Sequence, residues 1–133
     1  MIVMSGLSPS GTKASKGKVL FVGRDIFLGT MVANIVEKIG FSSTSSVPAK
    51  VFNTVSADLS IKALVVDMKE AKDFLAEIVE AGGTGSRPKL IAVIFHNDID
   101  SRRHAQKAGF EHVIHRSQLG TNLSQILTEK EKR

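Results

Sequence analysis

Charged side chains stand where two short apolar runs end, and they are residues that could do chemistry. The run KVLFV (18–22) leads into Gly-Arg-Asp (23–25), and the run ALVV (63–66) leads into Asp67. Loops after such strands carry function in many α/β proteins. A carboxylate there could accept a phosphoryl group or bind a metal ion, whereas its structural role would be to cap the next helix or to pair with a basic side chain.

These residues can act together only if the segments before them form neighbouring strands. Apolar and Ser-rich runs predict strands over residues 18–22, 42–47, 63–66, 90–95 and 112–115. Helical spacing predicts helices over residues 27–39, 48–59, 70–81, 98–108 and 119–130. Buried strands that alternate with helices indicate an α/β fold with a parallel sheet covered on both faces. We therefore predict a doubly wound three-layer sandwich with the flavodoxin-like strand order 2-1-3-4-5.

Length and composition predict a single soluble domain. The chain has 133 residues, of which 42% are hydrophobic and 23% charged. We expect a flexible leader over residues 1–16, the domain over 17–130 and a tail over 131–133. The lack of cysteine excludes disulfides, thiolate chemistry and cysteine metal sites. Apolar runs fall short of the ~20 residues of a membrane helix, no signal peptide is evident, and we expect a cytoplasmic protein.

The net charge of +5 suits an acidic partner or nucleic acid, but many basic residues lie near the termini. The chain has no Trp or Tyr, and its seven Phe mostly fall in apolar patterns. A stacking platform for bases is therefore poorly supported, and we expect no nucleic-acid partner.

The pattern as a whole resembles a bacterial response-regulator receiver domain (CheY-like) over residues 18–130. KVLFVGRDIFLGTMVANIVEKIGF is similar to that family's first strand, first helix and following Gly-Phe. ALVVD is similar to the strand that ends in the phosphorylated Asp, and QKAGFEHVIHR to the stretch that leads into the fifth strand and its Lys. The resemblance implies a two-component signalling domain in which Asp67 is equivalent to the phosphoacceptor.

The family's Mg²⁺-binding positions are altered. The resemblance places its two acids at Gly23 and Arg24, and only Asp25 follows. Mg²⁺ needs hard oxygen ligands, and phosphoryl transfer to a carboxylate needs an ion that neutralises the phosphate oxygens. We interpret this stretch as a degenerate acidic pocket in which Arg24 substitutes for the ion.

The other signature positions of the family also differ. The switch Ser/Thr falls on Ile94, or on His96 if the alignment slips. Arg116 and Ser117 stand at the positions of the Lys and Pro, and MKEAKDF (68–74) replaces the Met-Pro-x-x-x-Gly loop.

A cation beside Asp67 would compete with a metal ion for that carboxylate. At ~4 Å and an effective dielectric near 20, opposite charges attract by about 4 kcal/mol before desolvation. We therefore expect Arg24, Lys69 or Arg116 to hold Asp67 ionised and free of metal.

These features predict a pseudo-receiver that is not an enzyme, uses no cofactor or metal, and acts through protein–protein contacts. In the family that the chain resembles, the fourth helix, fifth strand and fifth helix commonly carry partner contacts or dimerisation. Here that face would be basic and suit an acidic protein or a second copy, through Arg102, Arg103, Lys107, His112, His115 and Gln118.

Three other readings stay open. The first is a receiver that is still phosphorylated on Asp67. The second takes GRDIFLG (23–29) as a degenerate dinucleotide loop, although no acid ends the strand SSTSSV to bind ribose. The third is a histidine metal site, which the opposite directions of His112 and His115 on a short strand disfavour.

Overall fold

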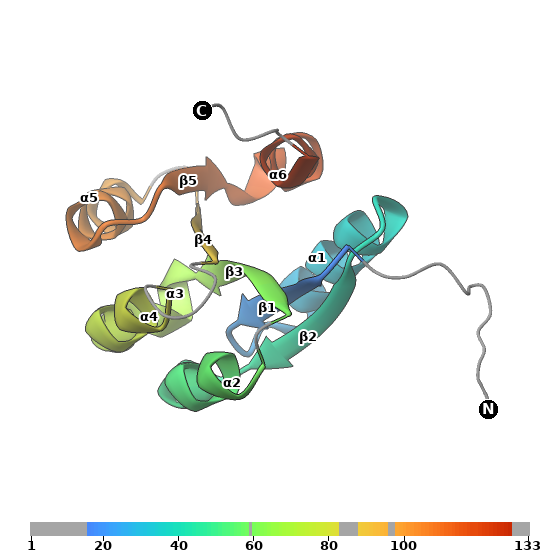
Figure 1. The fold of residues 1–133 in the computed structure, drawn as a ribbon. Coiled ribbons are helices and arrows are strands. Elements are labelled where there is room, and N and C mark those ends of the chain that lie inside the picture. Colours follow the sequence, from blue (N-terminus) through green and yellow to red (C-terminus); the bar gives the residue numbers. More distant parts are fainter. Residues whose placement is uncertain (1–15, 59, 83–87, 96–97, 129–133) are drawn as a thin grey trace, which may run out of the picture.

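Five parallel strands form one sheet in the order β2-β1-β3-β4-β5, which confirms the predicted topology (Figure 1). The structure is a computed structural model that describes residues 16–58, 60–82, 88–95 and 98–128. The strands are β1 (Lys18–Val22), β2 (Ser42–Ser46), β3 (Ile61–Asp67), β4 (Lys89–Ile94) and β5 (His112–His115). The predicted leader lies outside the described residues up to Ser15, and the predicted tail lies wholly outside them.

Helices cover both faces of the sheet (Figure 1). One face is covered by α1 (Ile26–Lys38) and α6 (Leu119–Thr128). The other face is covered by α2 (Val51–Ala57), α3 (Met68–Ala71), α4 (Leu75–Gly82) and α5 (Ile99–Ala108). Short 3₁₀ segments precede or join them, namely η2 (Pro48–Lys50), η3 (Lys72–Phe74) and η4 (Arg116–Gln118).

The central strands are buried on both faces, as the near-continuous apolar runs predict. In β1, Leu20 and Val22 point into the core under α2 and α4, whereas Val19 and Phe21 point into the core under α1 and α6. A fully buried side chain of this size contributes about 1.5–3 kcal/mol to folding. Two apolar cores therefore fix the sheet between its helical layers.

The segment after Asp67 differs from its prediction. A helix was expected from residue 70, after a loop, but α3 begins at Met68 directly after β3. Met68 and Ala71 are fully buried and three residues apart, so this first turn packs onto the core. The helical path is interrupted by η3 before α4 begins at Leu75. The residues that follow Asp67 are thus held rigidly at the end of the strand.

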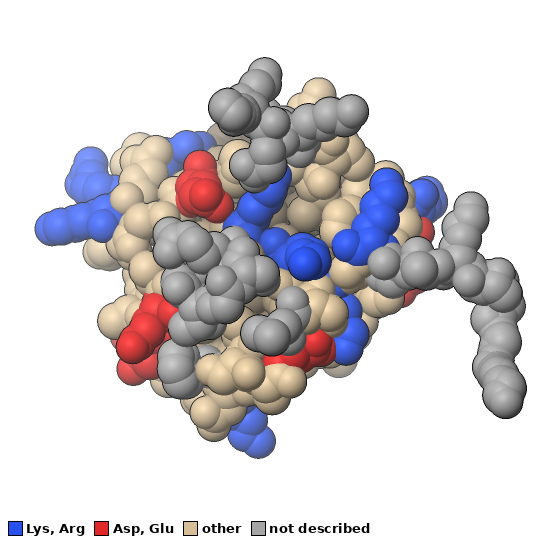
Figure 2. Space-filling model, in the orientation of Figure 1, with Lys and Arg blue, Asp and Glu red and all other residues tan. Residues whose placement is uncertain are grey.

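Lysines gather at the edge of the sheet where the strands begin, which we call the lysine edge (Lys16, Lys18, Lys62 and Lys89). Lys18 and Lys89 begin β1 and β4, and Lys62 is the second residue of β3. Figure 2 views the molecule from this edge and shows basic side chains grouped over its middle. No described helix is long and apolar enough to cross a membrane.

Candidate functional site

The carboxyl ends of β3, β4 and β5 bring three side chains together. Asp67 is the last residue of β3, Phe95 directly follows β4, and Arg116 directly follows β5. The register pairs Asp67 with Val93 and Ile94 with His115. Because these strands are neighbours in the sheet, the three residues lie at one edge with Phe95 in the middle position. Together with Asp25 and Lys69, they form what we call the Asp67 site.

Asp67 is a buried carboxylate, with only 6% of its surface exposed. The backbone N–H of Lys69 donates to Asp67 Oδ1 over 3.1 Å, which the immediate start of α3 makes possible. Burial raises the pKa of Asp67 above its usual value, and the hydrogen bond from Lys69 N–H partly opposes that rise. The negative charges of Glu70 and Asp25 also raise this pKa, and Arg116 lowers it.

Asp25 uses both carboxylate oxygens in contacts of its own. Its Oδ1 accepts from Leu28 N–H over 3.0 Å and caps α1, and Arg116 Nη1 lies 3.1 Å from its Oδ2. The hydrogen bond from Leu28 N–H is the main cause that lowers the pKa of Asp25, and Arg116 lowers it further. The carboxylate is therefore ionised at neutral pH and engaged by the helix end and the guanidinium.

The ring of Phe95 lies between two cations at the mouth of the Asp67 site. Lys69 Nζ and Arg116 Cζ each lie 5.5 Å from the ring centroid. Cations at this distance are attracted to the ring face by about 0.5–1 kcal/mol at exposed sites. A cavity of about 10 Å³ remains beside Asp67, bounded by residues that include Phe95 and Arg116. That volume is close to the space of a single water molecule.

Gly23 lets the end of β1 approach Asp67 closely. A Cβ atom at residue 23 would lie 3.0 Å from Asp67 Cβ and 3.1 Å from Phe21 Cζ. Such contacts are shorter than ordinary van der Waals packing allows, and the φ of +156° is also unfavourable for other residues. The present arrangement of Phe21 and Asp67 therefore leaves no room for an acidic side chain at this position.

The fold matches solved receiver domains along most of the chain. A response regulator from Thermotoga maritima gives a TM-score of 0.72 at 20% sequence identity, covering 86% of this chain and 96% of that one. The chain has the fold of a response-regulator receiver domain. Comparison by sequence matches no family model and no curated relative.

Two further receiver-fold matches were solved with a partner or bound groups. One is the P1 domain of CheA3 in complex with CheY6 from R. sphaeroides, with a TM-score of 0.65 at 12% identity, covering 86% of this chain and 95% of that one. The other is a response regulator from Burkholderia pseudomallei with a phosphorylated aspartic acid, a calcium ion and citrate. It gives a TM-score of 0.66 at 12% identity, covering 87% of this chain and 67% of that one.

Within this receiver fold, none of the three cations expected to hold Asp67 ionised is described in an ion pair with it, although Arg116 does lower the pKa of Asp67. Arg116 pairs with Asp25, Lys69 lies over Phe95, and Arg24 is exposed to solvent. Arg24 is therefore not an internal substitute for a metal ion. The physical reason is that Asp25, as the cap of α1, presents a free oxygen towards β5, where Arg116 reaches it more readily than the buried Asp67.

The other predicted site residues fall into two groups. Ile94 is a buried apolar residue at the end of β4 with 4% exposure, and Ser117 is exposed in η4, whereas His96 lies outside the described residues. On the predicted partner face, Arg102 Nη2 lies 2.8 Å from His115 Nε2. Arg103, Lys107 and Gln118 are exposed, and His112 is half-buried.

Sequence reasoning missed the role of Phe95. It was counted only as the last residue of a predicted apolar strand, whereas in the structure it follows β4 and 42% of its surface is exposed. A signal was present, because the predicted strand order already placed it between Lys69 and Arg116.

Proposed function

We propose that this chain is a pseudo-receiver, a cytoplasmic signalling domain that acts through protein–protein contacts without Mg²⁺-dependent phosphorylation of Asp67. The observation that carries the proposal is the set of contacts at the Asp67 site, where Arg116 engages the second carboxylate, Asp25, and lies over the ring of Phe95. The receiver fold supports the signalling role, and the matched CheY6 complex supports a protein as the partner.

The donor set around Asp67 does not fit Mg²⁺, which takes oxygen ligands in near-octahedral geometry. Asp25, Glu70 and Asp98 lie near Asp67. Asp25 already accepts from Leu28 N–H and pairs with Arg116, and Asp98 accepts from the N–H and the hydroxyl of Ser101. Gly23 supplies no side chain, and Arg24 supplies a cation. Among the described residues, no group of three or more His, Cys, Asp or Glu could hold a metal ion.

A phosphoryl group on Asp67 would have to fit beside Phe95 and Arg116. The space left there is about 10 Å³, close to that of one water, so we expect an acyl phosphate to displace the Phe95 side chain or to extend into solvent. The raised pKa of Asp67 further reduces its ability to act as a nucleophile at low pH. These features favour a site that keeps the receiver architecture without its chemistry.

The test is a mass measurement after treatment with acetyl phosphate and Mg²⁺. We expect the intact mass of the wild type to stay unchanged, and an NMR titration with Mg²⁺ to leave the Asp67 amide signal in place. The variant Asp67→Asn serves as the control for phosphorylation elsewhere. A single phosphoryl adduct on the wild type that is absent from Asp67→Asn would establish the phosphorylatable receiver instead.

The dinucleotide alternative has no supporting observation. The Leu28 N–H in the first turn of α1 already donates a hydrogen bond to Asp25, so it is not available to a pyrophosphate, which would bind there. Gly29 has a packing role, because a Cβ there would lie 3.3 Å from the Phe21 ring. A thermal-shift measurement with nicotinamide and flavin nucleotides should show no stabilisation.

A further inference from the structure

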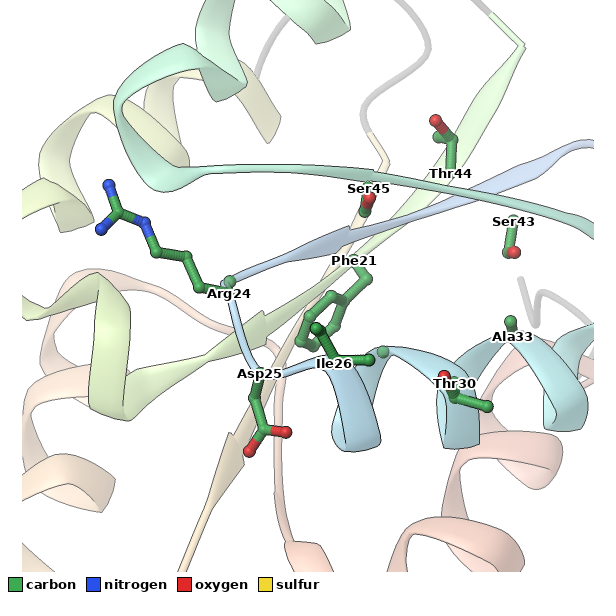
Figure 3. Close-up of a pocket in the computed structure, with 11 residues that line it drawn as sticks. Phe21, Arg24, Asp25, Ile26, Thr30, Ala33, Ser43, Thr44 and Ser45 are labelled. Atoms are coloured by element: carbon green, nitrogen blue, oxygen red, sulfur yellow. The ribbon is translucent and has the colours of Figure 1, made fainter.

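A groove separates α1 from the edge strand β2, on the side of β1 away from β3. We call it the α1–β2 groove and define it by Phe21 at its floor, Ile26, Thr30 and Ala33 on α1, and Ser43 and Ser45 on β2. Its volume is about 380 Å³. Figure 3 shows the serines of β2 across the groove from Thr30 and Ala33, with the Phe21 ring beneath.

Small side chains create this groove. Gly29 and Ala33 on α1, together with the serines of β2, leave space that larger residues would fill. Phe21 is 3% exposed and forms an apolar floor, so the groove combines an apolar base with hydroxyl groups on its walls. Ile26 lies at the start of α1 with 80% of its surface exposed, so it offers apolar surface at the rim of the groove.

The backbone of β2 offers hydrogen-bonding groups along the same groove. Ser42 N–H donates to Gly17 O over 2.9 Å, and Gly23 N–H donates to Ser46 O over 3.0 Å. In a parallel strand, successive residues direct their N–H and C=O groups to opposite sides, so those of Ser42 and Ser46 point towards β1 and those of every second residue between them point the same way. Ser43 and Ser45 therefore direct theirs away from β1, toward the side where no described strand lies.

Within the part of the chain that the structure describes, this edge lacks the usual protection against strand addition. Edge strands are commonly blocked by Lys, Pro, a bulge or a covering element. β2 has the sequence SSTSS, with no charge and no proline, and it pairs with β1 in unbroken register. An extended chain could therefore continue the sheet beyond β2 and place every second side chain in the groove.

A second copy of this chain does not fit the groove. If two β2 strands paired, each groove would receive only Ser and Thr side chains, which are too small to fill about 380 Å³. The net charge of +5 on each copy also opposes self-association. Arg24 is exposed at the end of the groove where β1 meets α1, and the neighbouring Asp25 is engaged by Arg116 and by Leu28 N–H. An acidic residue on the incoming chain would therefore be favoured beside Arg24.

We propose that the α1–β2 groove binds an extended segment of a partner protein, which adds to β2 as a sixth strand. The segment carries large apolar side chains at alternate positions, which fill the groove over Phe21 and against Ile26, and an acidic residue beside Arg24. The groove and the Asp67 site share Asp25, but the strand contact itself is made by Ser43 and Ser45 of β2, so the proposal does not depend on whether Asp67 is phosphorylated.

The test is an NMR titration of the full chain with the capped peptide Glu-Val-Thr-Val-Thr-Val-Glu. We expect saturable shifts of the Ser43 and Ser45 amide signals and slower hydrogen exchange of both amides. The control peptide Glu-Val-Val-Val-Thr-Thr-Glu has the same composition without the alternation, and it should bind at least tenfold more weakly. Equal binding of both peptides would overturn the proposal.

Two variant pairs locate the contact. Ile26→Ser should weaken binding at least tenfold, whereas Phe27→Ser should not, because Phe27 is equally exposed but does not line the groove. Ser45→Pro removes an outward N–H without breaking the pairing to β1, and it should abolish binding while Ser45→Thr preserves it. Equal effects of Ile26→Ser and Phe27→Ser, or unchanged binding by a folded Ser45→Pro, would contradict the proposal.

The free chain supplies the remaining test. In the absence of peptide, the Ser43 and Ser45 amides should exchange without protection at any protein concentration. If the protection of these amides from hydrogen exchange rose with protein concentration, the edge of β2 would be covered by a second copy of the chain. Protection independent of concentration would assign it to residues 1–15 of the same chain, and either result would overturn the proposal.

Discussion

Asp67 shows how burial and hydrogen bonding compete at a single carboxylate. Burial favours its neutral form, and the hydrogen bond from Lys69 N–H favours its charged form, with burial the stronger of the two. Its folded-state pKa lies above the unfolded value of 3.8. Between these two pKa values the folded chain binds more protons than the unfolded chain, so stability falls as the pH rises through that window.

Replacement of Asp67 by Asn should therefore stabilise the chain at neutral pH. Asn is neutral and can still accept from Lys69 N–H. We expect the free energy of unfolding of Asp67→Asn to exceed that of the wild type at pH 7. The difference should shrink as the pH falls through the folded-state pKa, and it should vanish below 3.8, where Asp67 is protonated in both states. Urea denaturation across this pH range measures it.

Asp58 provides the matched control of opposite sign. Its pKa is lowered to about 2, mainly by the hydrogen bond from Lys18, whose Nζ lies 2.6 Å from Asp58 Oδ2. Asp58→Asn should reduce stability at pH 7, and this loss should disappear as the pH falls through about 2. If both variants changed stability in the same direction at pH 7, the assigned environment of Asp67 would be wrong.

Asp25 combines a helix cap with an ion pair, and two substitutions separate them. Asp25→Ala removes both contacts. It should lower the free energy of unfolding by about 1 kcal/mol for the cap and by a few tenths of a kcal/mol for the ion pair with Arg116. Asp25→Asn keeps a side chain that caps helices well, so its free energy of unfolding should fall only by the few tenths of a kcal/mol of the ion pair. Thermal or urea denaturation at neutral pH distinguishes them, and equal losses would mean that the contact with Arg116 dominates.

The sequence predicted which residues meet at the Asp67 site better than it predicted their contacts. The position of Asp67 follows from the apolar run before it, and that of Arg116 from the run HVIH. Arg116 pairs with Asp25 and not with Asp67. Asp25 caps α1 with Oδ1, and this leaves its Oδ2 in position to meet the guanidinium. That detail requires three-dimensional positions, because it compares two acids that lie within reach of one cation.

At the scale of elements, strong apolar periodicity predicted the positions of strands and helices well. The exact residue at which a helix begins was predicted less well. β1 and β5 have the predicted bounds, and α1 begins one residue before the predicted start. The start of α3 was missed although Asp67, a residue type that caps helices, stands directly before it and accepts from Lys69 N–H. Burial of Met68 and Ala71, which the sequence pattern does not show locally, fixes this first turn against the core.

Two glycines in different elements should respond oppositely to alanine. Gly23 follows β1, where a Cβ would lie 3.0 Å from Asp67 Cβ, so Gly23→Ala should destabilise the chain by about 1–3 kcal/mol. Gly120 lies in α6, where an added Cβ would meet no other part of the described chain within 4 Å, so Gly120→Ala should stabilise by up to ~1 kcal/mol. Urea denaturation measures both, and a neutral Gly23→Ala would show that β1 and β3 can separate at this edge.

At the scale of the whole molecule, the two edges of the sheet differ in how their charges are arranged. The edge where the strands end mixes Asp25 and Asp67 with Lys69 and Arg116, whereas lysines predominate at the edge where the strands begin. Two of these lysines have partners, since Lys18 pairs with Asp58 and Lys89 Nζ donates to Ile126 O over 2.9 Å. Like charges this close repel one another at low ionic strength.

Lys62 should therefore reduce stability in low salt. Lys62→Gln removes one positive charge from the lysine edge and should raise the free energy of unfolding by roughly 0.3 kcal/mol at about 10 mM salt. The gain should fade near 1 M salt, where the Debye length is about 3 Å. Arg103→Gln is the matched control, because it changes the net charge equally but removes a partner of Asp100 on α5. A similar gain in both variants would mean that net charge, and not the clustering of lysines where the strands begin, sets the salt dependence.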